Sequence, residues 1–259
     1  MKKIGKISKV YYLIRIILGL GLWFYFRVWH RRHLRINGWK NIPRYGQLLI
    51  YSNHPSMMDP LMIIAILICS RWSLIFKPQV LLKTLAAAEN FAPENCRRLP
   101  IIRHIPILRD QPILKMITEN ECIFINETRK DFKALLRSCD WLYQRGSLLI
   151  FPEGGRTKVN IGGIDEFKEG IGLIAYKAMP RWILPIRIRG AEKVMPRGQD
   201  WPNWKKGQIT VSIGKPFTLE DLRLEYQGFR EFIAVNNRFK NLLIYQPLTN
   251  LFRKKLLEI

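Results

Sequence analysis

A histidine and an aspartate lie five residues apart in a segment restricted by two prolines. His54 precedes Pro55 and Asp59 precedes Pro60, and a residue before proline is pushed out of the helical region. Because proline is favoured at the first helical position, we expect Asp59 to be the N-cap of an apolar helix at residues 61–69. In a turn that ends at such a cap the two side chains can meet, whereas on a regular helix they would point to different faces.

A carboxylate on one imidazole nitrogen fixes the tautomer and raises the basicity of the other nitrogen, so this pair predicts a general base. Such a base would take a proton from a hydroxyl that attacks an activated acyl carbonyl. In the simpler alternative, Asp59 only caps the helix and His54 is an ordinary loop residue. The spacing alone does not decide between the two.

A second polar segment follows the buried strand predicted at residues 147–151. Pro152 ends that strand, and Gly154 permits a tight turn with the backbone close to a ligand. Glu153 and Arg156 would then lie at the carboxyl end of a strand, where ligands bind in open α/β sheets. A guanidinium there suits a phosphate, which accepts its paired N–H donors. An ordinary turn with a surface ion pair is the alternative.

Two further residues stand at apolar, strand-like segments. Arg109 comes just past residues 105–108, where a solvated surface arginine is the simple alternative. Pro185 lies within the run 183–188, where a proline predicts either an edge strand or a bulge.

Short apolar runs alternate with helical periodicity along the chain, and they predict the elements that position these residues. Strand and helix in alternation indicate an α/β fold with a mainly parallel sheet flanked by helices. Residues 111–126 have no decisive pattern. We expect strands at 48–51, 74–76, 105–108, 147–151, 183–188 and 208–213, and helices at 61–69, 131–144 and 170–178.

Composition excludes several classes of protein. The chain has 259 residues, of which 48% are hydrophobic, enough for a large buried core and too many for a disordered chain. Four cysteines without CxxC or Cys/His spacing predict reduced thiols, with neither a disulfide framework nor a structural zinc site. The net charge of +23 predicts a polyanionic partner, either a nucleic acid or an anionic membrane.

The distribution of charge favours the membrane. No acidic residue precedes Asp59, and an unbroken apolar run at 16–26 lies between Arg15 and Arg27. That run is shorter than the roughly 20 apolar residues that a membrane span needs. Its basic flanks and aromatic residues such as Trp23 suit a helix in the headgroup region. A secretory signal and a core helix with a solvated basic face are the alternatives.

Four segments in order resemble blocks of the glycerolipid acyltransferases, the family typified by 1-acylglycerol-3-phosphate O-acyltransferase. Residues 53–59 resemble its Asn-His-x-x-x-x-Asp block, the HX4D motif, and residues 151–157 resemble its Phe-Pro-Glu-Gly block. Residues 105–109 resemble the arginine block, and 184–186 the apolar proline block. The resemblance covers about residues 37–217, so residues 36–259 would form the acyltransferase domain and residues 1–35 a membrane-docking segment.

The resemblance implies roles for the site residues. His54 would be the base that acts on the acceptor hydroxyl, and Asp59 would orient it. The arginines would hold the acceptor's phosphate, the glutamate would contact its glycerol portion, and the proline would shape the wall beside the acyl chain. The implied substrate-binding residues are Arg109, Glu153, Gly154, Arg156 and Pro185.

The implied reaction moves an acyl chain from an acyl-CoA or acyl-carrier-protein thioester to the hydroxyl of a lysophospholipid, with no metal and no other cofactor. The leading acceptor is 1-acylglycerol 3-phosphate, which would yield phosphatidic acid at the cytoplasmic face of an anionic membrane. Glycerol 3-phosphate, another lysolipid, or a catalytically silent lipid-binding role are alternatives. A nucleic-acid partner is not expected, because the aromatic residues form a continuous apolar run instead of alternating with basic residues.

Overall fold

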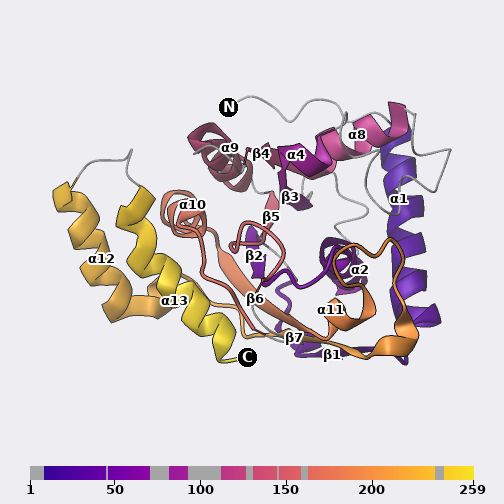
Figure 1. Ribbon diagram of the computed structural model, residues 1–259. Helices are drawn as coiled ribbons and strands as arrows, with labels where there is room; N and C mark the ends of the chain where they lie inside the picture. Colours follow the sequence, from indigo (N-terminus) through magenta and orange to yellow (C-terminus); the bar gives the residue numbers. More distant parts are fainter. Residues whose placement is uncertain are drawn as a thin grey trace.

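The computed structural model places the strands of the chain in one mixed sheet (Figure 1). It describes residues 9–44, 46–70, 82–92, 112–126, 131–144, 146–158, 163–236 and 242–259. Within these ranges the strands are β1 (Leu34–Asn37), β2 (Leu48–Ser52), β3 (Leu82–Ala87), β4 (Cys122–Ile125), β5 (Ser147–Ile150), β6 (Trp182–Arg189) and β7 (Ile209–Ile213). Their order is β1-β7-β6-β2-β5-β3-β4, and every neighbouring pair is parallel except β6 and β7. The predicted α/β class with a mainly parallel sheet is confirmed.

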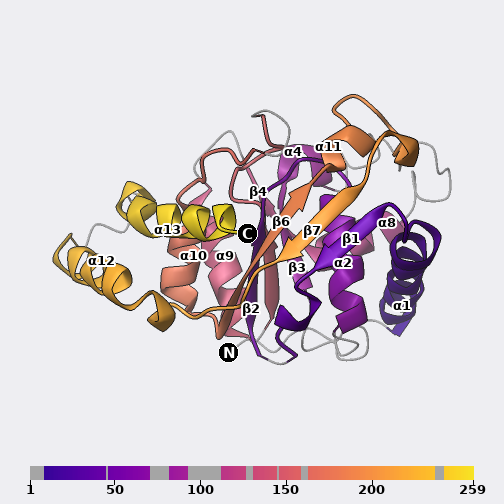
Figure 2. The same ribbon diagram turned by 90° about the horizontal axis from the view of Figure 1, so that it is seen from below.

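Helices cover both faces of the sheet (Figure 2). The main helices are α1 (Lys9–Phe24), α2 (Asp59–Ser70), α8 (Pro112–Glu121), α9 (Phe132–Tyr143), α10 (Gly170–Ala178), α11 (Ala191–Val194), α12 (Arg223–Asn236) and α13 (Gln246–Leu257). One face is covered by α9, α10 and α13, and the other by α2 with α1 packed outside it. In both views α12 lies at the end of the molecule opposite α1.

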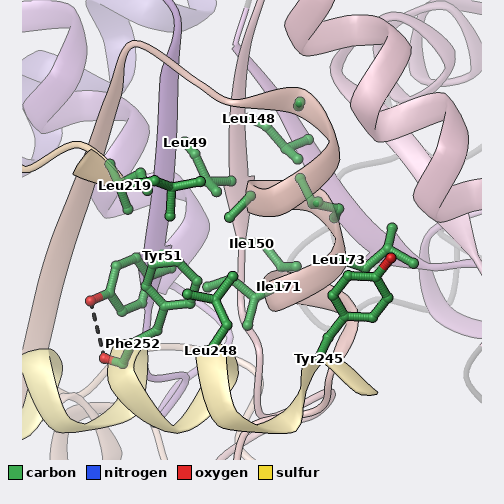
Figure 3. Close-up of a cluster of buried hydrophobic side chains, with 14 of the residues drawn as sticks. Leu49, Tyr51, Leu148, Ile150, Ile171, Leu173, Leu219, Tyr245, Leu248 and Phe252 are labelled. Carbon is green, nitrogen blue, oxygen red and sulfur yellow. Dashed lines mark hydrogen bonds between the residues drawn. The ribbon is translucent and has the colours of Figure 1, made fainter. Parts of the chain in front are cut away.

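The central strand β2 is buried on both of its faces, as a parallel strand between two helical layers must be. Because side chains alternate along a strand, Leu49 and Tyr51 enter the core under α10 and α13, while Leu48 and Ile50 enter the core under α2. Figure 3 shows the first of these cores, where the Tyr51 hydroxyl donates a 3.1 Å hydrogen bond to the backbone carbonyl of Phe252. This bond ties α13 to the strand that leads into the candidate site.

Most of the predicted elements occur at the expected residues. The strands expected at 48–51, 147–151, 183–188 and 208–213 and all three expected helices are confirmed. The strands expected at 74–76 and 105–108 lie outside the described residues. Strand β3 was not predicted, and the undecided segment 111–126 holds α8 and β4. Cys122 and Cys139 are free thiols, as predicted.

Pro185 lies on an internal strand, so the edge-strand prediction is wrong and the bulge prediction is correct. On the β7 side, Ile183 bridges to Phe217 and Ile186 pairs with Ile213. Two residues of β6 therefore face three residues of the partner segment, 214–216, which is the geometry of a β-bulge. Proline has no backbone N–H to donate, and the bulge interrupts the hydrogen-bond ladder at this point, so a proline is tolerated here.

The N-terminal helix α1 packs mainly against α2 and also contacts α8. Its Arg15 side chain forms a 2.7 Å ion pair with Glu121 of α8. Helix α1 also carries an exposed apolar stripe, with one residue every three or four positions and each 41% to 61% exposed: Leu13, Ile17, Leu20 and Phe24 of α1, continued by Val28 in the π-helical turn Tyr25–Trp29. The face of α1 turned to solvent is therefore apolar, and the alternative of a core helix with a solvated basic face is wrong.

The expected boundary between residues 35 and 36 falls inside β1, which pairs with β7 and places the buried Leu34 in the core. The sheet thus begins before the predicted boundary. Within the described part of the chain, none of the helices combines the length and the apolar character that crossing a bilayer requires.

Two glycines provide a matched test of how closely the C-terminal segment packs on α10. A Cβ on Gly172 of α10 would lie 2.8 Å from the Tyr245 backbone oxygen and 2.7 Å from Thr249 Oγ1, whereas a Cβ on Gly228 of α12 would meet nothing within 4 Å. We expect Gly172→Ala to lower the free energy of unfolding by about 1–3 kcal/mol through overpacking. Gly228→Ala should raise it by up to about 1 kcal/mol, because alanine is the better helix former. Urea unfolding measures both, and an unchanged stability of Gly172→Ala would contradict this packing.

Candidate active site

The candidate site lies where three adjacent parallel strands end. Strand β2 lies between β5 and β6, so the segments that follow these strands emerge at one edge of the sheet. Residues 53–59 follow β2, residues 151–157 follow β5, and α11 follows β6. The two polar segments singled out in the sequence are thereby brought together, at the position where open α/β sheets bind ligands.

His54 and Asp59 meet as predicted. Nδ1 of His54 lies 2.9 Å from Oδ2 of Asp59. The His54 side chain is 14% exposed and that of Asp59 is completely buried. Because an ionised carboxylate can only accept, this bond requires the proton on Nδ1 and leaves Nε2 as an acceptor. The pair has the geometry of a general base with its orienting carboxylate.

The prediction that Asp59 is the N-cap of the following helix is wrong. Helix α2 begins at Asp59 itself, and its first intrahelical bond runs from the N–H of Met62 to the carbonyl of Met58. The carboxylate turns back toward the loop, where it also accepts the backbone N–H of Ser56 at 2.7 Å. Burial raises the pKa of Asp59, and the hydrogen bond from His54 opposes this rise. His54 and Ser56 are thus the groups that stabilise the buried negative charge.

The backbone on either side of His54 is fixed by contacts with β6 and with the loop that follows β5. The side-chain amide of Asn53 donates to the carbonyl of Ile188 and accepts the N–H of the same residue, both at 2.8 Å. The carbonyl of His54 accepts the N–H of Thr157 at 2.8 Å. The imidazole stacks on the ring of Phe151, with centroids 4.2 Å apart and planes inclined by 25°. The ring is therefore held from several directions, and its orientation does not depend on Asp59 alone.

Glu153 holds the same loop from the β5 side. Its Oε1 accepts the backbone N–H of His54 at 3.2 Å, and burial raises its pKa. The next residue, Gly154, has a left-handed backbone with φ of 65°, which strongly favours glycine. A Cβ there would also meet the end of the Lys168 side chain. Both residues therefore shape the loop beneath the imidazole.

Arg156 lies in the same loop as Glu153 and Gly154, and it is partly buried. Its guanidinium interacts electrostatically with Asp59 and with Arg197, a residue that the sequence did not suggest. Arg197 also donates from its guanidinium to the backbone carbonyl of Arg156. The expected partner Arg109 lies outside the described residues. Pro185 lies within β6, opposite Tyr51, the residue before the last one of β2.

Several contacts at the site have no signature in the sequence, although Asn53 and Ser56 lie in the segment that it singled out. The contact between Asn53 and Ile188 joins residues 135 positions apart, and only the strand order brings them together. Ser56 donates from Oγ to the carbonyl of Met195 at 3.1 Å, which is a similar long-range contact. Within the described ranges, no three or more His, Cys, Asp and Glu side chains are grouped so that they could hold a metal ion.

The buried Glu153 predicts a pH dependence of stability. Because burial raises its pKa above 4.5, the folded protein binds this proton more tightly than the unfolded chain. The resulting stabilisation is present below pH 4.5 and is lost as the pH rises through the folded-state pKa. Glutamine does not titrate, so Glu153→Gln does not lose this stabilisation as the pH rises. The unfolding free energy of the variant minus that of wild type should therefore increase from about pH 4 to about pH 8.

Urea unfolding across this range measures the effect. Glu231→Gln, at an exposed position of α12, is the matched control. A difference between Glu153→Gln and wild type that falls with rising pH would contradict the burial of an ionisable carboxyl group at this position.

Comparisons with known proteins identify the fold and the family of this chain. The chain resembles the crystal structure of the 1-acyl-sn-glycerophosphate (LPA) acyltransferase PlsC from Thermotoga maritima, with a TM-score of 0.55 and 18% identity over 86% of this chain and 75% of that chain. This is a likeness of fold. No curated protein sequence gives a significant match. The sequence model of the family described as Acyltransferase matches residues 33–189, which is more than half of the chain and includes both polar segments of the site. The chain therefore belongs to the acyltransferase family, as its resemblance to the glycerolipid acyltransferases predicted.

Proposed function

We propose that this protein transfers an acyl chain from a thioester to the free hydroxyl of a lysophospholipid, with 1-acylglycerol 3-phosphate as the acceptor. The observation that carries the proposal is the bond between His54 and Asp59 at the edge of the sheet. Membership of the acyltransferase family supports the reaction type. Arg156 beside this pair supports an acceptor with a phosphate.

The geometry supports a simple sequence of proton transfers. Nε2 of His54 removes the proton of the acceptor hydroxyl while the oxygen attacks the carbonyl carbon of the thioester. The tetrahedral intermediate collapses, the carbon–sulfur bond breaks, and the leaving thiolate takes the proton from the imidazolium. An ester and a free thiol result, and His54 returns to its starting state. Asp59 stabilises the imidazolium that forms between the two steps.

The exposed stripe of α1 supports an acceptor that comes from a membrane. A helix with an apolar face turned to solvent is suited to insertion at the headgroup level. Trp29, 72% exposed, continues this surface just beyond α1, and Arg31, Arg32 and Arg35 are exposed nearby. An anionic bilayer surface complements this combination. The donor would be acyl-CoA or an acyl carrier protein, and the membrane face would be the cytoplasmic one.

The first test removes the base. His54→Ala should lower the rate of transfer from a labelled acyl thioester to lysophosphatidate by roughly 10²–10⁴-fold, the usual contribution of general base catalysis. Asp59→Asn should also lose most of the activity, because it cannot stabilise the imidazolium by charge. Formation of the labelled diacyl product is the measurement.

Asp140→Asn, at an exposed position of α9, is the control for the carboxylate change, and the thermal melting of each variant checks its folding. A folded His54→Ala variant that keeps more than a few per cent of the activity would exclude His54 as the base.

The second test concerns the apolar stripe. Wild-type protein should float with vesicles that contain phosphatidylglycerol, and less so as salt rises. The double variant Ile17→Glu/Phe24→Glu should bind these vesicles at least tenfold more weakly, because each change replaces about 1.5–3 kcal/mol of apolar burial with a charge.

Leu224→Glu on α12 is the matched control, since Leu224 is 90% exposed and α12 lies at the opposite end of the molecule from α1 (Figure 1). Equal vesicle binding by wild type and the double variant would show that α1 is not the docking surface.

A further inference from the structure

We propose that Arg197 and Arg156 together form a two-guanidinium site for the phosphate of the acceptor. This inference rests on the proposed function and adds to it a residue from the loop after α11. Its ligand class is a phosphate monoester on a glycerol backbone.

Arg197 is placed by a loop with fixed ends. Just before it, the carbonyl of Met195 accepts the hydroxyl of Ser56 at 3.1 Å, which anchors the loop to the turn that carries Asp59. The carbonyl of Val194 accepts the N–H of Asn203 at 2.7 Å, which closes the loop at its base. Arg197 is therefore tied to the segment that carries the catalytic pair.

The bond from Arg197 to the carbonyl of Arg156 connects two of the three strand ends. Arg197 belongs to the chain after β6, and Arg156 to the chain after β5. Strand β2 lies between these strands, and its own end carries His54. The two arginines thus meet beside the base. A phosphate held there would place the glycerol hydroxyls of the same molecule near Nε2 of His54.

The charges around the pair favour an anion. Among the described residues, neither Arg156 nor Arg197 forms an ion pair within 4 Å. Partial burial, and after it the charge of Arg197, lower the pKa of Arg156, and the attraction of Asp59 opposes them. Two like charges held together without a counterion repel each other, and a bound dianion removes this repulsion. A phosphate monoester carries about −1.5 to −2 charges near neutral pH.

The alternative is that Arg197 only braces the loop through its bond to the Arg156 carbonyl. A guanidinium has five N–H donors, and Arg197 is exposed, so this one bond leaves further donors for a ligand. A bracing role predicts a loss of stability and an equal effect on every acceptor. A phosphate-binding role predicts an effect confined to acceptors that carry a phosphate.

The experiment compares lysophosphatidate with monoacylglycerol, which has the same acyl chain and hydroxyl but no phosphate. Arg197→Ala should raise the KM for lysophosphatidate about tenfold or more, the effect of removing a charged hydrogen-bond partner. The KM for the thioester, and any turnover of monoacylglycerol, should stay within about twofold of wild type. Arg197→Lys should restore part of the affinity, because lysine keeps the charge. The restoration should be incomplete, because lysine lacks the planar fork of donors.

A binding measurement separates this inference from the proposed function. In the His54→Ala background, calorimetry with lysophosphatidate should give an affinity that Arg197→Ala weakens about tenfold or more, while Arg223→Ala on the exposed start of α12 has no effect. If wild type fails to acylate lysophosphatidate but this loss of binding is observed, the proposed function fails and the phosphate site stands. Equal losses on both acceptors, or unchanged binding by a folded Arg197→Ala variant, would overturn the site. Should Arg197→Ala not fold, Arg197→Lys decides, since unchanged affinity for lysophosphatidate would then contradict paired recognition.

Discussion

The contact between the His54 imidazole and the buried Asp59 carboxylate is the interaction on which the proposed chemistry depends. A carboxylate without exposure to water is costly unless polar groups hold it, and here His54 and the backbone of Ser56 do so. The burial that raises the pKa of Asp59 also makes its attraction for an imidazolium stronger than it would be in water. The same environment that makes the carboxylate costly therefore makes it effective as a partner for the base.

The sheet supplies the rigidity that this contact needs. Strand β2 is buried on both faces, and the chain that leaves it is held on one side through Asn53 and on the other through the carbonyl of His54. Glu153 accepts the N–H of the same histidine. Residues that are distant in the sequence thus converge on one imidazole because their strands are neighbours. An α/β sheet provides such convergence at the carboxyl ends of its parallel strands.

The parts of the fold and site that depend on local sequence patterns, such as apolar runs and prolines, could be predicted. Apolar runs located β2, β5 and β6, and the two prolines around residues 54–60 correctly predicted that His54 and Asp59 would meet. Local pattern could not predict contacts such as Asn53 with Ile188, because these depend on the order and register of strands far apart in the sequence. Arg197 was missed for the same reason. The N-cap prediction for Asp59 failed because the carboxylate is recruited by the imidazole and by Ser56, in competition with the helix end.

The most direct test of the account is the tautomer of His54, measured by long-range ¹H–¹⁵N correlation spectra of protein labelled at histidine. The chain has four histidines, and comparison with a His54→Gln variant assigns the signal of His54. In the neutral ring we expect the proton on Nδ1 and an unprotonated Nε2, and we expect Asp59→Asn to disturb this preference. A proton on Nε2 in the wild-type protein would contradict the account, because the nitrogen assigned to take the hydroxyl proton would already carry one.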